Sequence, residues 1–199
     1  MEELSIKSDE DFLKLAYKLG KPITSRINGF LIDNLIPVRK EEAHKQSISA
    51  NFGTNAFPFH TDGAYFKIPP KFILLRYING ISNPTPTLVC NLKDITTTDK
   101  RILKHSVWKV KSRDLSFYSS ILSEDERIFR FDKCIMQPAD SKNDNSIYLE
   151  QLISTLPKEQ INWEINKTVV IDNWNYLHTR PEVKDNEINS RNLQRIMIL

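Results

Sequence analysis

The residues best suited to chemistry in this chain are two histidines and an aspartate. His60 and Asp62 are two positions apart within residues 57–66, and His178 stands alone far along the sequence. In an extended strand, residues i and i+2 point to the same side, so His60 and Asp62 can reach one ion while Thr61 faces away. The imidazole of His178 would complete a three-ligand metal site.

Two imidazoles and one carboxylate are typical of non-haem Fe(II), because three protein ligands leave positions open for a cosubstrate and for dioxygen. The pattern His60-x-Asp62 is weak by itself, since a surface histidine beside an aspartate in a turn has the same sequence. The residues that precede His178 strengthen the metal-site interpretation. Residues 166–173 predict a turn, a β-branched strand and a polar break, so His178 is expected in a loop just beyond a buried strand.

A pair of arginines near the end of the sequence is the second chemical feature. Residues 190–199 predict a closing strand, on which Arg191, Leu193 and Arg195 share one face. An arginine that faces inward needs an anionic partner, because burying an unpaired charge is costly. A dicarboxylic acid bound in a pocket is such a partner, and the guanidinium fork matches a carboxylate in bidentate fashion.

Taken together, these segments resemble a known family, the Fe(II)- and 2-oxoglutarate-dependent oxygenases of the taurine dioxygenase and clavaminate synthase type. The resemblance covers nearly the whole chain and depends on the order and spacing of residues 19–23, 59–63, 69–76, 172–173, 177–180 and 191–195. It implies an oxidoreductase that uses Fe(II), 2-oxoglutarate and O2. Such an enzyme oxidises, most often hydroxylates, an unactivated C–H bond of a small anionic or amino-acid-like substrate, and releases succinate and CO2.

The resemblance also implies roles for individual residues. The two histidines and the aspartate match the iron ligands, and Thr87 matches a threonine that binds one end of 2-oxoglutarate. Arg191 matches the arginine that binds the distal carboxylate of 2-oxoglutarate. Arg195 matches a second arginine, which contacts the substrate or the cosubstrate, and an exchange of roles between the two arginines stays open. No catalytic residue beyond the iron ligands is implied.

The sequence departs from the family pattern at several places. Residues 83–86, Asn-Pro-Thr-Pro, stand where family members usually carry paired glycines, so the turn before Thr87 must differ in geometry. The chain is short for the family, which implies that the inserted segments that cover the pocket are reduced. Asp62 is retained, whereas halogenating relatives lose this carboxylate, so hydroxylation, desaturation or ring chemistry is favoured.

The remaining sequence predicts the elements that must position these residues. A helix is expected after an N-cap at Ser8, ending at Gly20, and two more at residues 99–105 and 145–156. Strands are expected at residues 71–81, 88–92 and 107–110, with further strands within 127–136. Many short strands, few helices and no internal repeat favour a mainly β (α+β) fold built as an antiparallel jelly roll.

The resemblance implies the same architecture, a double-stranded β-helix with a few flanking helices, as a single domain over residues 1–199. In a jelly roll, strands distant in sequence become neighbours around one open end. The three candidate metal ligands can therefore converge without a local motif that joins them.

Composition narrows the class of protein. The chain has 199 residues, a net charge of +3 and two cysteines, Cys90 and Cys134, which are expected to be reduced structural thiols. Its polar N-terminus resembles neither a secretory signal nor a transit peptide, and no apolar run approaches the ~20 residues of a membrane helix, so we expect a cytoplasmic protein without a membrane partner. Five dispersed glycines argue against a nucleotide-binding loop.

The sequence is compatible with several partners and with one alternative function. Basic residues between positions 100 and 113 raise a nucleic-acid hypothesis, but the low net charge favours a solvated surface. The expected partner is a small-molecule substrate, either free or tethered to a carrier protein, and a homo-oligomer is compatible with reduced pocket covers. The alternative is a non-catalytic metal-binding jelly-roll protein that binds a small acid or a protein partner.

Overall fold

The computed structural model describes residues 2–45, 47–112 and 115–199, and this part of the chain is mainly β with a few short helices. The helices are α1 (Asp9–Leu19), α2 (Ser49–Phe52), α3 (Thr97–His105) and α4 (Ser146–Thr155), with 3-10 turns η1 (Lys40–Glu42), η2 (Ser141–Asn143) and η3 (Asp185–Glu187). The strands are β1 (Glu2–Ser5), β2 (Pro22–Ile23), β3 (Asp33–Leu35), β4 (Phe72–Asn79), β5 (Thr87–Asn91), β6 (Val107–Val110), β7 (Phe117–Ser120), β8 (Met136–Pro138), β9 (Lys158–Ile161), β10 (Lys167–Asp172), β11 (Tyr176–Thr179) and β12 (Asn192–Ile198).

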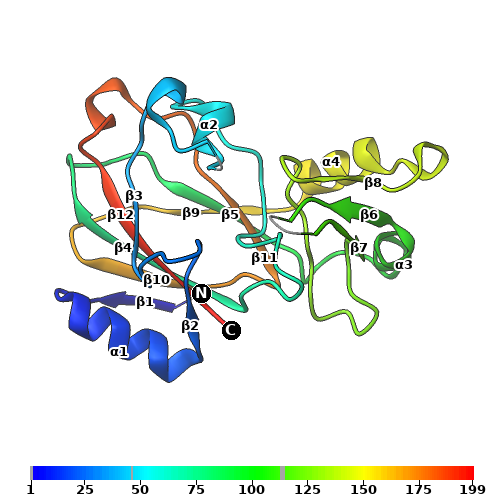
Figure 1. The fold of residues 1–199 in the computed structure, drawn as a ribbon, viewed down its shortest axis with the longest axis horizontal. Coiled ribbons are helices and arrows are strands. Elements are labelled where there is room, and N and C mark those ends of the chain that lie inside the picture. Colours follow the sequence, from blue (N-terminus) through cyan, green and yellow to red (C-terminus); the bar gives the residue numbers. More distant parts are fainter. Residues whose placement is uncertain (1, 46, 113–114) are drawn as a thin grey trace.

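These strands pair in antiparallel sheets (Figure 1), and except for β6 with β7 the paired strands are not consecutive in the sequence. The largest sheet has the order β1-β10-β4-β12-β2, and β3 also pairs with β12. The second sheet has the order β11-β5-β9, and the third has the order β7-β6-β8. The mainly β class predicted from the sequence is confirmed.

The large sheet and the second sheet share one apolar core. Ile73 and Tyr77 of β4 belong to the same buried cluster as Val89 of β5 and Ile161 of β9. In a strand, alternate residues face one side, so this cluster takes every second residue of β4. The core therefore lies between the two sheets that carry the candidate functional residues.

Helix α1 covers the outer face of the large sheet. The hydroxyl of Ser8 accepts a hydrogen bond from a backbone N–H of the first turn, and the helix ends at Gly20, as the sequence predicts. Phe12 and Ala16 are fully buried in a cluster with residues of β4, β10 and β12. An added Cβ at Gly20 would meet the carbonyl oxygen of Leu199 at 2.2 Å, so glycine is required where the helix ends against the last strand.

Arg76 fastens α1 to this sheet. It lies on β4 and is only 1% exposed, and its guanidinium contacts the side chains of Gln194 and Asp9. The guanidinium also lies over the ring of Phe12, 4.6 Å from the ring centroid. The arginine that interrupts an apolar strand in the sequence is therefore a structural residue that joins helix and sheet.

Replacing Arg76 tests this role. We expect Arg76→Met to lower the free energy of unfolding by about 2–4 kcal/mol, because Gln194 keeps a buried polar group without its donors. Urea denaturation measures the change. Lys14→Met is the control, because it removes an exposed ion pair with Glu10 within α1. It should lower the free energy of unfolding by less than about 1 kcal/mol. Equal costs for the two variants would contradict the assignment.

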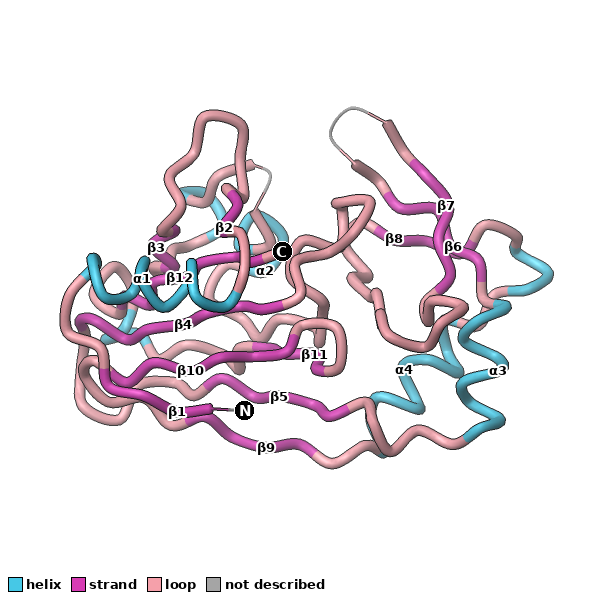
Figure 2. Tube along the Cα trace, turned by 90° about the horizontal axis from the view of Figure 1, so that it is seen from below, coloured by secondary structure: helices cyan, strands magenta, loops and turns pink. Residues whose placement is uncertain are grey.

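The third sheet lies with α3 and α4 at one end of the molecule, away from α1 (Figure 2). Its core includes Leu103, Trp108 and Leu149, and Cys90 and Leu177 of the second sheet belong to the same cluster. A continuous core therefore joins this end to the rest of the chain. No helix among the described residues combines the length and apolarity needed to cross a membrane.

Most of the predicted elements occur where the sequence places them, and residues 127–136 are an exception. Residues 127–136 were expected to form strands, and they hold one bridge residue, Phe129, and the first residue of β8. The backbone N–H of Phe131 bonds to the Thr61 side chain, and that of Arg130 bonds to the Ile121 carbonyl. This segment is therefore held by contacts to separate loops, and a local sequence pattern cannot show such contacts.

Candidate metal centre

His60 and His178 face each other across a single β-bridge. The backbone N–H of each donates to the carbonyl oxygen of the other, at 3.0 and 3.1 Å, and their ring centroids are 4.5 Å apart. His178 lies within β11, so its predicted place in a loop was wrong. A tight turn at Trp174 and Asn175, closed by a hydrogen bond to the carbonyl of Asp172, lets a new strand begin directly after β10.

The His60-to-Asp62 segment is not the extended strand that the sequence suggests. His60 is a single bridge residue, and residues 62–65 form a turn. Thr61 nevertheless points away from the two candidate ligands, as expected. Its hydroxyl donates to the carbonyl of Phe129 at 3.2 Å and accepts from the N–H of Phe131 at 3.1 Å.

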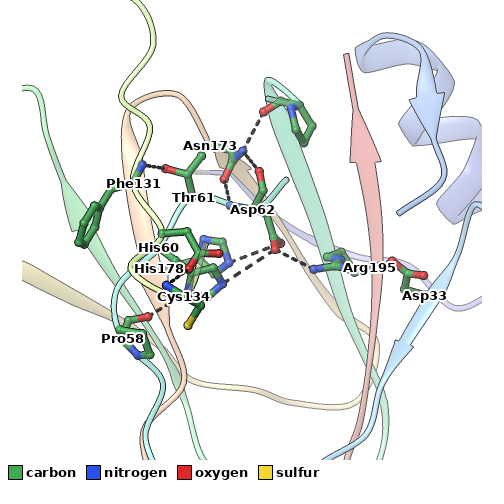
Figure 3. Close-up of polar contacts among 12 residues, drawn as sticks. Asp33, Pro58, His60, Thr61, Asp62, Phe131, Cys134, Asn173, His178 and Arg195 are labelled. Carbon is green, nitrogen blue, oxygen red and sulfur yellow. Dashed lines mark hydrogen bonds and ion pairs between the residues drawn. The ribbon is translucent and has the colours of Figure 1, made fainter. Parts of the chain in front are cut away.

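The backbone of Asp62 is fixed by Asn173, a fully buried residue at the end of β10 (Figure 3). The side-chain oxygen of Asn173 accepts from the N–H of Asp62 at 2.9 Å. Its amide nitrogen donates to the carbonyl of Asp62 at 3.0 Å and to that of Pro70 at 2.8 Å. A residue far along the chain thus holds both backbone groups of the aspartate.

Removing this amide should loosen the aspartate. We expect Asn173→Ala to lower the free energy of unfolding by about 2–4 kcal/mol, because buried backbone groups of Asp62 lose their partners. Chemical denaturation followed by circular dichroism measures it. Asn162→Ala removes an amide whose bond to Gln160 is exposed, and should change stability by less than about 1 kcal/mol. If Asn173→Ala left the free energy of unfolding unchanged, this would show that water replaces these hydrogen bonds without loss of stability.

The three side chains form a compact buried group. His60, Asp62 and His178 are each less than a tenth exposed, and they offer ligand atoms that all lie within 4.8 Å of one another. Oδ2 of Asp62 is 3.5 Å from Nε2 of His178, and Oδ1 is 3.9 Å from Nε2 of His60. Among the residues that the structure describes, no other such group of three occurs.

The electrostatic state of the group suits a cation. Burial, and then the imidazole of His178, lower the pKa of His60, which favours its neutral form. Burial alone would raise the pKa of Asp62, but Arg195 and the two imidazoles lower it well below its usual range, so it is an anion. Nδ1 of His60 lies 2.9 Å from the carbonyl of Pro58. If Nδ1 donates there, Nε2 keeps its lone pair toward Asp62.

This donor set fits a divalent transition metal. Two imidazoles and one carboxylate match the facial triad of non-haem Fe(II). Ligand atoms on one ion at bonds of about 2 Å stand roughly 3 Å apart. The two carboxylate–imidazole pairs are wider, at 3.5 and 3.9 Å, and all of the ligand atoms lie within 4.8 Å of one another. A small closure of the side chains would therefore complete the site.

Arg195 lies beside this group. Its Nη1 donates to Oδ1 of Asp62 at 2.7 Å, and its Nη2 donates to Oδ2 of Asp33 at 2.8 Å. Burial opposes the charge, but the two carboxylates outweigh it and raise the pKa of Arg195 above its usual value. Asp33 is a contact that sequence reasoning missed, because nothing local marks it.

Arg191 has different partners. It precedes β12, and the register shifts between Asn192 and Leu193, so the strand alternation predicted for Arg191 and Arg195 does not extend to it. Its Nη2 donates to the carbonyl of Thr85 at 3.0 Å, and its Nε is 3.5 Å from Oε2 of Glu187. Burial lowers the pKa of Arg191.

Glu187 is the second functional neighbour that the sequence did not reveal. It is fully buried, and Oε1 accepts hydrogen bonds from both the N–H and the hydroxyl of Thr85, each at 2.8 Å. The available signal was its spacing of four residues from Arg191. That spacing is uninformative in a polar stretch, where most acidic residues are solvated.

Thr87 is the buried first residue of β5. Its hydroxyl accepts a hydrogen bond from Nε1 of Trp163 at 3.1 Å. Val89, two residues later, pairs directly with His178 across the second sheet. Directly paired residues and residues i and i+2 share a face, so Thr87 and His178 face the same side.

Comparisons with known proteins bear on the fold. No protein-family model and no curated protein matches this sequence. Among solved structures, an asparagine oxygenase in complex with Fe(II), 3-hydroxyasparagine and succinate is similar over 95% of this chain, with 17% identity and a TM-score of 0.73. The non-haem iron oxygenase OrfP with Fe, succinate and (3S)-hydroxy-L-Arg is similar over 95% of this chain, with 17% identity and a TM-score of 0.72.

OrfP with Fe and α-ketoglutaric acid also matches over 95% of this chain, with 18% identity and a TM-score of 0.70. At these identities the comparisons show a shared fold. The chain spans 63% of the length of the asparagine oxygenase and 64–66% of the length of OrfP in these complexes. It therefore shares the fold of these non-haem iron oxygenases.

Proposed function

We propose that this chain is an Fe(II)- and 2-oxoglutarate-dependent oxygenase that hydroxylates a C–H bond of a small, amino-acid-like substrate. The observation that carries the proposal is the convergence of His60, Asp62 and His178 in one buried group. Similar solved structures contain Fe with α-ketoglutarate, or with succinate and a hydroxylated amino acid. The fold and the donor set thus support the same chemistry by independent routes.

The architecture is part of the proposal. We take the large sheet and the second sheet, which pack over one core, as the two halves of a jelly roll in a single domain over residues 1–199. The bridge between His60 and His178 would then mark the open end, where strands distant in sequence meet.

The roles of the residues follow from their contacts. Fe(II) bound at this centre would supply activation of dioxygen, coupled to oxidative decarboxylation of 2-oxoglutarate. His60 and His178 would offer imidazole nitrogens. Asp62 would offer a carboxylate, and Asn173 fixes the backbone of this aspartate. The buried faces around them exclude water from the reacting groups.

Cosubstrate binding would use the residues beyond the metal group. Arg191 would bind the distal carboxylate of 2-oxoglutarate, because it is a buried guanidinium whose Nε has no hydrogen-bond partner among the described residues. The hydroxyl of Thr87, on the same side of the sheet as His178, would bind the other end.

A direct assay tests the proposal. The metal-free protein is supplied with Fe(II), 2-oxoglutarate and air, and succinate is measured with pools of L-amino acids and their carboxylate analogues. We expect succinate formation that needs Fe(II) and that one pool stimulates at least about tenfold. A mass increase of one oxygen atom in a component of that pool would identify the substrate.

The non-catalytic alternative has one observation in its favour. Arg191 is already 3.5 Å from Glu187, so a buried carboxylate occupies the neighbourhood where 2-oxoglutarate would bind. On this alternative the protein binds a metal but forms no succinate with any pool. Measuring metal binding beside succinate formation in the same samples distinguishes the two functions.

A further inference from the structure

Arg195 joins two carboxylates that belong to different parts of the chain. Asp33 on β3 pairs directly with Arg195 on β12, so backbone pairing places these two residues together. The guanidinium uses Nη2 for Asp33 and Nη1 for Asp62. Figure 3 shows the resulting row, from Asp33 through Arg195 to Asp62 and then to the two imidazoles.

Asp33 is itself held in position. Its second oxygen, Oδ1, accepts a hydrogen bond from the hydroxyl of Ser25 at 2.9 Å. The carbonyl of Ser25 accepts one from the hydroxyl of Tyr65 at 2.8 Å, and Tyr65 belongs to the turn that follows Asp62. The chain of contacts therefore returns to the candidate metal motif.

The contact with Arg195 makes the two oxygens of Asp62 different. Oδ1 accepts the hydrogen bond from Arg195 and lies 3.9 Å from Nε2 of His60, whereas Oδ2 lies 3.5 Å from Nε2 of His178 and is not bonded to Arg195. A carboxylate can bind a metal through one oxygen or through both. If both oxygens of Asp62 bound the ion, they would fill a position that the proposed reaction needs for the cosubstrate or for dioxygen.

The charge of Arg195 would by itself oppose a divalent cation nearby. Asp33 balances that charge at 2.8 Å, so the arginine can hold the ligand without a large repulsive cost. Both terminal nitrogens are engaged by carboxylates of this chain, which also argues against their use for a substrate anion.

We propose that Asp33 and Arg195 are positioning residues of the metal centre. Asp33 orients and neutralises Arg195, and Arg195 retains Oδ1 of Asp62, so that only Oδ2 is offered to the ion. The inference depends on the proposed function for the existence of the metal centre. It assigns a role to Asp33 and changes the expected role of Arg195 from a substrate contact to a support for a ligand.

Co(II) titration of the metal-free full chain tests the proposal without turnover. We expect Asp33→Asn and Arg195→Lys to weaken Co(II) binding by about 10- to 100-fold, the usual effect of removing a partner of a metal ligand. Asp125→Asn is the matched control, since Asp125 forms an exposed ion pair with Arg127 at 2.6 Å. It should bind Co(II) within about twofold of wild type.

The visible absorption of bound Co(II) reports a change that a merely structural role would not produce. In the double variant Asp33→Asn/Arg195→Gln, Oδ1 is released, and we expect the bands to change as a second oxygen joins the ion. The double variant removes one positive and one negative charge together, so it serves if a single variant fails to fold. The control keeps the wild-type spectrum.

The possible outcomes of the Co(II) measurements lead to different conclusions. If His178→Ala abolishes Co(II) binding while the Asp33 and Arg195 variants keep wild-type affinity and spectrum, the positioning role is wrong and the metal centre stands. If the wild-type chain binds no Co(II), the metal centre fails and the positioning role fails with it. Weaker binding together with a changed spectrum in the double variant supports the proposal.

Discussion

If the chain has the proposed oxygenase activity, replacing His178 or Asp62 with alanine will abolish succinate formation, with a loss of at least about 100-fold relative to wild type. Each substitution removes one of the three donors that the structure brings within 4.8 Å. Two remaining donors hold a divalent ion much more weakly than three. The measurement is Fe(II)-dependent succinate release under air, with 2-oxoglutarate and the stimulating substrate pool at fixed concentration.

The control for this prediction is a histidine elsewhere in the chain. His105 is exposed at the end of α3, so His105→Ala should retain activity within about twofold. Circular dichroism of each variant checks that the fold is kept. If His178→Ala or Asp62→Ala turned over at the wild-type rate, the ligand assignment would be wrong, whatever metal the protein contains.

The parts of this site that sequence predicts are those whose residue type is rare and specific. Four histidines occur in the chain, so the pair of His60 and His178 could be selected by type, spacing and flanking strands. The strands themselves follow from apolar and β-branched runs, as β4 and β10 show. These signals are local, so they can be recognised without knowledge of the tertiary structure.

The supporting residues could not be found in this way. Asn173, Asp33 and Glu187 are of common polar types, and each acts through a partner far away in sequence or hidden by burial. Asn173 reaches Asp62 across 111 positions, so no local window contains both. The position of His178 was mispredicted for a related reason, because a tight turn started a new strand that the polar residues before it concealed.

If the chain has the proposed oxygenase activity, neutralising Arg191 should remove its preference for a dicarboxylic cosubstrate. We expect Arg191→Gln to raise the KM for 2-oxoglutarate by about 30-fold or more, since loss of one partner of a buried charge pair costs 2–5 kcal/mol. A 2-oxo acid that lacks the distal carboxylate should be affected little. The ratio of kcat/KM for the two acids therefore separates a lost anchor from a general loss of activity.

Because Glu187 is the ion-pair partner of Arg191, a double variant tests the proposed anchor more directly. Arg191→Gln alone leaves Glu187 fully buried without its counter-charge, which can destabilise the protein by about 3–5 kcal/mol. The double variant Arg191→Gln/Glu187→Gln removes both charges, so it should fold and still lose the preference for the dicarboxylate. Glu187→Gln alone frees the guanidinium, so it should lower the KM for 2-oxoglutarate. If the double variant kept the wild-type preference, another cation would be the anchor. Arg195 would then be tested first, because the sequence left open an exchange of roles between the two arginines.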